Sequence, residues 1–327
     1  LYKTKDITNG ISINFVDVTL PKTLGEVLRS TTASSFDLSQ YNLTVNEGEP
    51  INYIVTEKDL QNGSMGELGS GEKIIRGATK EASDTVINAN GIARIFCLGS
   101  RDKLTLENLT IASAKSSYSG GAIYNYNNST GSVTLNNVVF ANNSVSQGGA
   151  IWNSGTITFG GDATFTGNSA SSSGGAIVNY GSSSKITFNG DATFAGNSSS
   201  SYGGAIYNVS DGTITFGENS TATFTGNSAS YDGAIHNYGA ITFGGEATFT
   251  NNSASSSSSS GGAIYNNYDS TITFGTDSSV SFSNNTANGQ LNDIYNYRGT
   301  INILGEVKSD IHLVSKGGTI GLKAKDT

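Results

Sequence analysis

The stretch GAIHNYGAITFGGEATFTNNS, residues 233–253, holds the pattern that decides the fold. Almost the same letters begin near residues 149, 175, 204 and 262, and the isoleucine of Gly-Ala-Ile recurs every 26 to 30 residues. A repeat of this length is typical of a solenoid, in which each unit buries its apolar face only against its neighbours. The recurring isoleucines are Ile123, Ile151, Ile177, Ile206, Ile235, Ile264 and a weaker copy at Ile294.

Each repeat contains three short segments in which apolar and polar residues alternate. The first segment is Gly-Ala-Ile-x-Asn, the second is x-Ile-Thr-Phe and the third is Ala-Thr-Phe-x-x-Asn, as residues 175–197 show. Apolar side chains two positions apart have the period of a β-strand, and the i, i+3, i+4 spacing of an amphipathic helix does not occur among these repeats. Three strands per repeat, each beside its copy in the next, predict an all-β right-handed parallel β-helix with about 29 residues per coil.

The residues between the strands predict how the coils are joined. Asparagines that end the first and third segments, such as Asn179 and Asn168, suit turns and stacked side-chain ladders. The Gly-Gly pair before Ala-Ile marks a close approach of two backbones or a positive φ angle. Serine-rich stretches of different lengths separate the third segment from the next Gly-Gly pair, and we expect them to be exposed loops.

The chain divides into two regions. Residues 1–70 carry more charge and no repeat, so we predict an N-terminal cap there, followed by a parallel β-helix over residues 71–327. The repeats are regular over about 117–297 and become irregular, shorter coils over 298–327. No apolar run of a secretion signal stands at the start, and no closing cap is evident at the end. We therefore expect a mature piece of a longer protein.

An early coil without Gly-Ala-Ile precedes the regular repeats. In it, Leu104 and Leu106 take the places of Ile and Phe in the second segment, and Ile111 takes the place of Phe in the third.

Charge excludes one class of partner. Residues 117–297 contain nine acidic residues and one basic residue, Lys185, so this region carries the formal charge of −8 that the whole chain also has. Such a surface repels a phosphate backbone, so we expect no nucleic-acid partner. No stretch approaches the roughly 20 apolar residues that span a bilayer, so we expect no membrane insertion within this chain.

Cys97 is the only cysteine, which excludes an intrachain disulfide and a cysteine metal cluster. It lies in the apolar run ARIFCLGS, so we expect a buried thiol. We predict no metal and no cofactor.

Two tetrapeptides alternate along the middle of the chain and resemble the repeat pair of the chlamydial polymorphic membrane proteins and related autotransporter passengers. Gly-Gly-Ala-Ile stands at 120–123, 148–151, 174–177, 203–206 and 261–264, with Asp-Gly-Ala-Ile at 232–235. Phe-x-x-Asn stands at 140–143, 165–168, 194–197, 224–227, 249–252 and 282–285.

The resemblance covers the middle half of the chain and implies a biological setting. A protein of this kind is an exported, non-enzymatic passenger at the outer membrane of a Gram-negative-type cell, anchored by a carboxy-terminal barrel outside this chain. Such passengers are often adhesins linked to virulence. The partners that we expect are a host-cell receptor protein or glycan, a neighbouring bacterial surface, or a second copy of the chain.

The residues after the repeated isoleucine predict where adhesion takes place. If this isoleucine points inward, the side chains one and three positions later point outward. Exposed aromatic rings suit sugar rings or protein partners, although stacked aromatics also simply favour parallel strand pairing. The candidate adhesive face consists of Tyr124, Trp152, Tyr207, His236, Tyr265 and Tyr295 in the first column, and of Tyr126, Tyr180, Tyr238 and Tyr297 in the second.

A column of carboxylates precedes the third segment. Successive carboxylates suit Ca²⁺, which takes six to eight oxygen ligands, but no calcium-binding glycine-aspartate motif accompanies them. We expect solvated turn residues. The column consists of Asp162, Asp191, Glu218, Glu246 and Asp277.

Two other functions stay open. β-Helices also occur as polysaccharide-degrading enzymes, but the repeat region offers only His236 as a general base, in a column where we expect a surface substitution. Outward Thr-x-Thr rows such as Thr156/Thr158 and Thr213/Thr215 resemble the ice-binding faces of antifreeze solenoids, but Lys185, Ala195 and Ala240 interrupt the rows.

Overall fold

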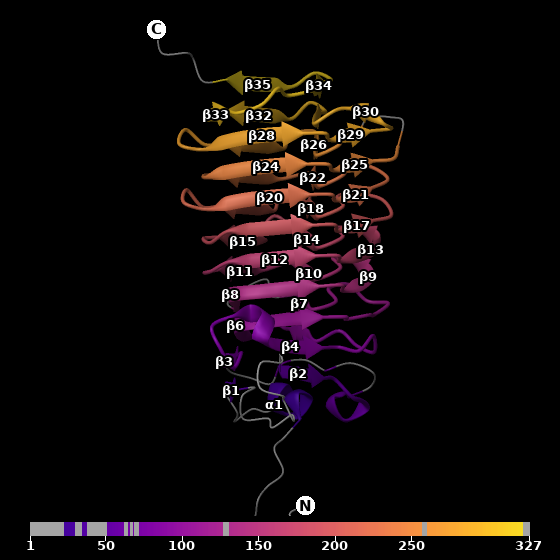
Figure 1. The fold of residues 1–327 in the computed structure, drawn as a ribbon, viewed down its shortest axis with the longest axis vertical. Helices are drawn as coiled ribbons and strands as arrows, with labels where there is room; N and C mark the ends of the chain where they lie inside the picture. Colours follow the sequence, from indigo (N-terminus) through magenta and orange to yellow (C-terminus); the bar gives the residue numbers. More distant parts are fainter. Residues whose placement is uncertain are drawn as a thin grey trace, which may run out of the picture.

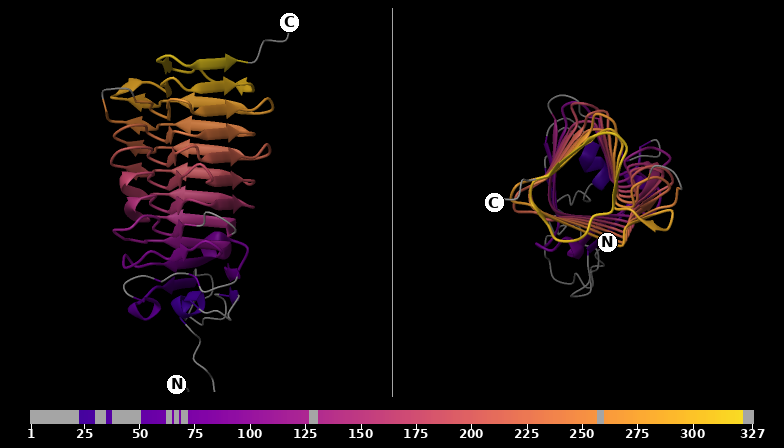
Figure 2. Two further views of the ribbon diagram at one scale, coloured as in Figure 1. Left: turned by 180° about the vertical axis from the view of Figure 1, so that it is seen from behind. Right: turned by 90° about the horizontal axis from the view of Figure 1, so that it is seen from above.

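The strands of the protein stack into one long coil of parallel turns (Figure 1). This computed structural model describes residues 23–29, 35–37, 51–61, 65, 68, 72–126, 131–256 and 260–322. Seen along the stack, the coils superimpose around a closed outline (Figure 2). The predicted all-β parallel solenoid is therefore confirmed.

One coil shows how the repeat folds. The three predicted segments form β10 (Ile151–Asn153), β11 (Thr156–Phe159) and β12 (Ala163–Thr166). A fourth strand, β13 (Ser169–Ser173), follows them. Each strand pairs in parallel with its copy one coil later, so that equivalent residues of successive repeats lie side by side.

In the described residues, the first segments form one sheet, which we call the first-segment sheet. Its other strands are β5 (Phe96–Leu98), β7 (Ile123–Asn125), β14 (Ile177–Tyr180), β18 (Ile206–Val209), β22 (Ile235–Asn237), β26 (Ile264–Asn266), β31 (Ile294–Asn296) and β34 (Leu313–Ser315).

The second and third segments share a larger sheet, because two early strands, β6 (Lys103–Ala112) and β8 (Ser132–Ala141), run through both. The other second segments are β15 (Lys185–Phe188), β19 (Thr213–Phe216), β23 (Ala240–Phe243), β27 (Thr271–Phe274), β32 (Thr300–Ile303) and β35 (Thr319–Leu322). The other third segments are β16 (Ala192–Ala195), β20 (Thr221–Thr225), β24 (Glu246–Thr250), β28 (Ser279–Ser283) and β33 (Glu306–Val307).

The serine-rich stretches, predicted as exposed loops, begin with the short fourth strand that the sequence reasoning missed. Its alanines, such as Ala229 and Ala254, are buried, because a small side chain lets the backbone pack closely against the coil. The other fourth strands are β9 (Ser144–Gln147), β17 (Ser198–Ser199), β21 (Ser228–Ala229), β25 (Ser253–Ala254) and β29 (Thr286–Ala287), with β30 (Gln290–Leu291) antiparallel to the last.

The shaft is filled by the predicted isoleucines and phenylalanines. Phe159 stacks on Phe188 of the next coil with ring centroids 4.3 Å apart, and Phe165 stacks on Phe194 at 4.7 Å. The two phenylalanine columns meet edge to face, as Phe159 and Phe165 do at 5.8 Å. Offset and edge-to-face contacts are the favourable arrangements of aromatic rings, so the two columns stabilise each other as well as the stack of coils.

Two buried asparagine ladders run along the shaft, as predicted. In each ladder the side-chain amide donates a hydrogen bond to the side-chain carbonyl of the next coil at 2.7–3.0 Å. All these amides therefore point their N–H groups the same way. The ladders contain Asn125, Asn153, Asn179, Asn208, Asn237, Asn266 and Asn296, and Asn143, Asn168, Asn197, Asn227, Asn252 and Asn285.

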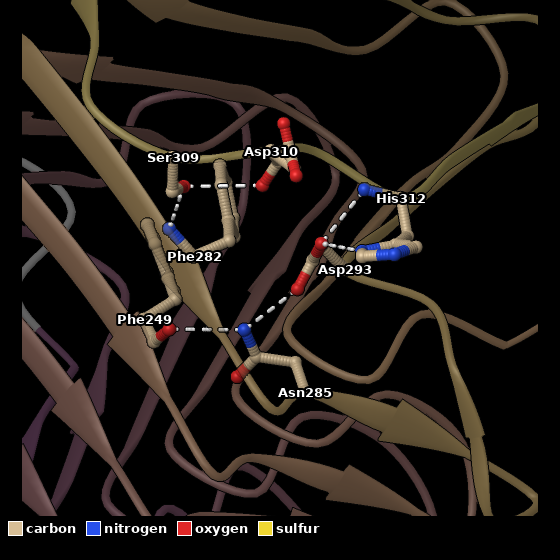
Figure 3. A network of polar contacts seen from close by, with 7 residues as sticks. All are labelled: Phe249, Phe282, Asn285, Asp293, Ser309, Asp310 and His312. Carbon is tan, nitrogen blue, oxygen red and sulfur yellow. Dashed lines mark hydrogen bonds and ion pairs between the residues drawn. The ribbon is translucent and has the colours of Figure 1, made fainter.

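The second ladder ends on a buried carboxylate (Figure 3). Asn285 Nδ2 donates to Asp293 Oδ1 at 2.8 Å, and Asp293 Oδ2 accepts from the backbone N–H of His312 at 2.8 Å and lies 3.1 Å from its Nδ1. Asp293 stands where earlier coils have the alanine of Gly-Ala-Ile. An ionised carboxylate accepts hydrogen bonds and donates none. Asp293 can therefore accept the last N–H group of the ladder, at the end toward which all its amide N–H groups point.

The Gly-Gly pair is required by both of the reasons that we expected. Gly148 has φ 62°, and a Cβ atom at Gly149 would overlap the carbonyl oxygen of Gly175 in the next coil. The exception is Asp232, which takes the place of the first glycine at φ 71°. A non-glycine residue in the left-handed region is strained, so a contact that holds Asp232 in place is expected.

The two irregular ends continue the stack. In the early coil, Leu104 lies opposite Val133 and Ile111 opposite Phe140, as predicted. At the other end Ile294 lies opposite Ile264. Beyond it, β32 to β35 form the shorter coils.

The N-terminal region is described only in part. The helix α1 (Leu24–Arg29) lies within the outline of the coils at the indigo end (Figure 2), and its Leu24 and Leu28 join the core. Most of residues 1–70 lie outside the described residues, so the predicted cap and its boundary stay predictions. The remaining elements here are β1 (Ser35–Asp37), β2 (Ile51–Ile54), β3 (Glu72–Arg76) and β4 (Thr85–Asn88), with the 3-10 helices η2 (Glu57–Asp59) and η3 (Ala82–Asp84).

A candidate aromatic binding face

The outer side of the first-segment sheet carries two groups of stacked aromatic rings, separated in the first column by Val178, and we call them together the aromatic face. Tyr124 stacks on Trp152 with ring centroids 4.7 Å apart, and Trp152 stacks on Tyr180 at 5.6 Å. Further along, Tyr265 stacks on Tyr295 at 5.5 Å. Because parallel strands lie about 4.8 Å apart, equivalent rings of successive coils fall at stacking distance.

The two predicted columns of this face differ in exposure. The second column is exposed, from 55% for Tyr126 to 37% for Tyr238 and Tyr297. The first column is largely covered, since Trp152, His236 and Tyr295 are buried. The expectation that every residue after the repeated isoleucine is exposed is therefore wrong for these three.

The cover comes partly from tyrosines that the sequence reasoning missed. Tyr202 and Tyr231 lie at the end of serine-rich stretches and stack on each other at 5.1 Å, and Tyr202 also stacks on Tyr207 at 5.7 Å. Each directly precedes the turn that opens the next first segment, which brings its ring over the aromatic face. Their position before the Gly-Gly or Asp-Gly pair was the signal available in the sequence.

The beginning of the aromatic face carries a cation. The guanidinium carbon of Arg94 lies 4.5 Å from the ring centroid of Tyr124 and 5.7 Å from that of Tyr118. Cys97 pairs with Tyr124 and therefore belongs to the first column of the same face. It is half-buried on the outer side of the sheet, so the expectation of a buried core thiol is wrong.

His236 and Asp232 form a buried pair beneath the tyrosines. His236 Nδ1 is hydrogen-bonded to Asp232 Oδ2, and both side chains are at least 97% buried. The expectation of a surface substitution at His236 is therefore wrong. Both residues depart from the repeat in the same coil, where others have Gly and an aromatic or Val, and their contact holds Asp232 at its strained φ angle.

The surroundings of this pair are aromatic. The His236 ring stacks on Tyr265 at 4.6 Å and meets Tyr202 and Tyr207 edge to face. Burial raises the pKa of Asp232, and the attraction of His236 opposes that rise. Among the residues that the structure describes, His236 Nε2 has no hydrogen-bond partner, and it is buried, whereas a general base must lie within hydrogen-bond reach of its substrate.

The acidic column behaves as a set of turn residues. Asp162 Oδ1 accepts the backbone N–H of Asp191 at 3.0 Å, and Asp191 Oδ1 accepts that of Thr221 at 2.7 Å. Glu246 forms an exposed ion pair with Lys308 at 3.1 Å. Within the described residues, no three His, Cys, Asp or Glu side chains are grouped so that they could hold a metal ion.

The threonine rows are partly regular. Thr158, Thr187, Thr215, Thr242 and Thr273 lie side by side in five successive coils. The neighbouring column is interrupted by Lys185 and Ala240. Threonine is a good strand residue, and identical coils in register align any repeated residue, so these rows need no further function.

The buried phenols make stability depend on alkaline pH. Burial raises the pKa of Tyr207 to about 12, whereas the same phenol in the unfolded chain ionises near pH 10. Between these values only the unfolded chain releases the proton, so the stabilising contribution is complete below about pH 10 and is lost as pH rises to about 12. Tyr207→Phe is expected to reduce the fall in unfolding free energy measured by urea titration from pH 9 to about pH 11.5.

Tyr126→Phe, at an exposed phenol, is the matched control for this pH dependence. If it reduces the alkaline loss as much as Tyr207→Phe does, burial of Tyr207 is not the cause.

The protein is thus a parallel β-solenoid that carries the aromatic face on its outer side. Its sequence matches the Chlamydia polymorphic membrane protein repeat at residues 137–154, 162–180, 191–209 and 246–267. Each matched segment runs from a third strand through the buried asparagine and fourth strand to the next first strand. These four segments of the chain are thus repeats of the chlamydial polymorphic membrane protein type.

Searches of curated proteins and of solved structures gave no significant match. The repeats and the solenoid fit a non-enzymatic passenger of a surface autotransporter, and repeats of this type indicate an outer-membrane or cell-surface location. None of the helices in the described residues has the length and apolar character needed to cross a bilayer.

Proposed function

We propose that this chain is an adhesin, a surface-displayed passenger that binds a host-cell receptor, a glycan or a neighbouring bacterial surface through its aromatic face. The solenoid supplies length and rigidity, because every coil is fixed to its neighbours by paired strands and asparagine ladders. The aromatic face supplies the contacts.

The observation that carries the proposal is the exposed second column. Tyr126, Tyr180, Tyr238 and Tyr297 present large rings to solvent along one side of the stack, over a first column that is already packed. The underlying rings hold the exposed ones in place, so little side-chain freedom is lost on binding. Tyrosine combines an apolar ring with a polar tip and is enriched where proteins bind partners.

The test removes the exposed rings and keeps the packed ones. Tyr126, Tyr180, Tyr238 and Tyr297 are changed together to serine, and binding of the purified protein to host cells and to a glycan array is measured. Binding is expected to fall at least about tenfold, while the circular dichroism spectrum and thermal midpoint stay close to those of the native protein. The matched control is Tyr268→Ser, an equally exposed tyrosine in the turn after β26.

Unchanged binding by the fourfold variant would refute the role of the aromatic face. Hydrolysis or β-elimination of a polysaccharide by the native protein would instead favour the enzyme alternative.

A further inference from the structure

One end of the aromatic face differs from the rest in charge. Arg94 precedes β5 and lies against Tyr124 and Tyr118, and its Nη1 donates to the backbone oxygen of Ser119 at 3.0 Å. No carboxylate lies within ion-pair distance of Arg94 among the residues that the structure describes. Its positive charge is therefore balanced only by ring faces and one carbonyl, and several guanidinium N–H groups remain for a ligand.

The rings beside Arg94 form the most exposed part of the aromatic face. Tyr118 is 68% exposed, and Tyr126 and Tyr180 are exposed as well. Trp152 lies buried between Tyr124 and Tyr180 and stacks on both, so these rings form a rigid, nearly parallel platform. The aliphatic side chain in the same columns, Val178, is buried.

The charges around this platform indicate which charge a ligand should carry. The acidic column of the repeats lies in the turns before the third strands or, for Glu246, at the first residue of β24, and it is not part of the first-segment sheet. The described strands β5, β7 and β10 contain no Asp, Glu, Lys or Arg residue, and the charged side chain that lies against their rings is Arg94. A ligand lying on this platform therefore meets one cation, although the whole chain carries a formal charge of −8.

We infer that Arg94 with Tyr118, Tyr124, Tyr126, Trp152 and Tyr180 forms a binding site for an acidic saccharide that bears an isolated carboxylate. The apolar C–H face of a sugar ring lies on the exposed tyrosines, and its hydroxyl groups reach the phenol tips and water. The carboxylate takes the free N–H groups of Arg94, whose planar fork matches its two oxygens.

This inference rests on the proposed function and names the class of ligand for one part of the aromatic face. A single carboxylate is favoured over a polyanion, because the net charge of the chain repels a long anionic polymer. At physiological ionic strength this repulsion is screened beyond about 8 Å, so one carboxylate at Arg94 avoids most of it.

The test compares each acid with its own neutral ester. Binding of a sialic-acid-terminated and of a glucuronic-acid-terminated trisaccharide, and of the methyl ester of each, is measured by titration calorimetry. We expect the acids to bind about 10- to 100-fold more tightly than the esters, the range of a charge-assisted hydrogen bond. In Arg94→Gln this preference is expected to disappear, with the binding of the esters unchanged.

Two further variants locate the site. Arg298→Gln is the matched control, because Arg298 makes a cation–π contact with Tyr297 at the opposite end of the face. It is expected to keep the preference for acids. Arg94→Lys keeps the charge without the fork and is expected to retain part of the preference.

Cys97 gives an independent readout next to Tyr124. Bound trisaccharide is expected to slow alkylation of the Cys97 thiol several-fold in the native protein and not in Arg94→Gln. Since this measurement and the thermal midpoint are made on the same samples, loss of folding in a variant is separated from loss of the site.

Equal binding of acids and esters, or an undiminished preference in Arg94→Gln, would overturn the inference. So would tighter binding of a heparin hexasaccharide than of either trisaccharide, since the ligand would then be a polyanion. If the protein binds cells through the exposed tyrosines but shows no preference for acids, this inference fails alone. If the fourfold serine variant binds cells normally, the proposed function fails instead.

Discussion

Asn197→Leu is expected to destabilise the centre of the solenoid by about 3–6 kcal/mol. Leucine has the same number of side-chain heavy atoms as asparagine, branched at the same Cγ, but neither donates nor accepts hydrogen bonds. Asn197 Nδ2 donates to the oxygens Phe165 O and Asn227 Oδ1, and its Oδ1 accepts from the backbone and side-chain N–H groups of Asn168, all at 3.0 Å. The change takes these partners from Phe165 O and from both N–H groups of Asn168, and each buried group left unsatisfied costs about 1–3 kcal/mol. Asn227 Oδ1 keeps the backbone N–H of residue 197 as a donor.

The loss should be local as well as large. In a solenoid each coil is stabilised mainly by its two neighbours, so a weak coil in the middle uncouples the two halves. Hydrogen exchange followed by mass spectrometry is expected to show faster exchange in β12, β16 and β20 than in the end coils. The urea midpoint of the whole protein should fall with it.

The control is the asparagine one position before an equivalent ladder residue. Asn251 is exposed at φ 56°, and three other coils have glycine at this place, so Asn251→Gly is expected to change stability by less than about 0.5 kcal/mol. If Asn251→Gly costs as much as Asn197→Leu, the ladder bonds are not the source of the stability.

The second large effect is expected at the buried pair of Asp232 and His236. His236→Tyr restores the residue of the neighbouring coils but leaves the Asp232 carboxylate buried without its partner. Asp232→Gly restores the glycine but leaves the His236 imidazole without its partner. Each single change is expected to cost about 3–5 kcal/mol, as breaking a buried pair does.

The double variant Asp232→Gly/His236→Tyr is expected to be as stable as the native protein or more stable. It rebuilds the repeat of the neighbouring coils, removes the strain at φ 71° and leaves no buried charge. Urea denaturation of the four proteins gives the coupling energy as a double-mutant cycle. A double variant that loses the sum of the two single losses would show that the pair is not an energetic unit.

Much of the fold could be predicted because the same alternation of apolar and polar residues recurs in every repeat. A single Ile-Thr-Phe segment does not show which side of the strand faces the core. Its recurrence does, because a register that turned Ile214 and Phe216 outward would expose the equivalent Ile and Phe of every coil. The asparagine ladders could be predicted for the same reason. Asn179 and Asn208 have one place in the coil, and stacking coils must bring them together.

The candidate site was predicted less completely, because its covering residues lie outside the regular repeat. The periodicity places Trp152 and His236 on the outer side of the first-segment sheet, which is correct. It does not tell how far a serine-rich stretch of variable length folds over that side. Tyr202 and Tyr231 belong to such stretches, and their rings reach the aromatic face only through the turn that follows.

The pairing of His236 with Asp232 was missed for a different reason. Each residue is an exception in its own column, and a column taken alone does not show that the two exceptions fall in the same coil. Two departures in one coil, four residues apart on either side of a tight turn, are a signal of contact that a sequence can show.

The one-way asparagine ladders have a consequence for how such a molecule changes length. Every internal coil receives hydrogen bonds from one neighbour and gives the same bonds to the other, so duplication or deletion of a whole unit leaves each junction as it was. Only the last asparagine of each ladder needs a different acceptor, which Asp293 supplies to the second ladder and the backbone oxygen of Gly299 to the first. Gene duplication can therefore adjust the length of the solenoid in steps of about 4.8 Å per coil, with each new junction bonded like the existing ones.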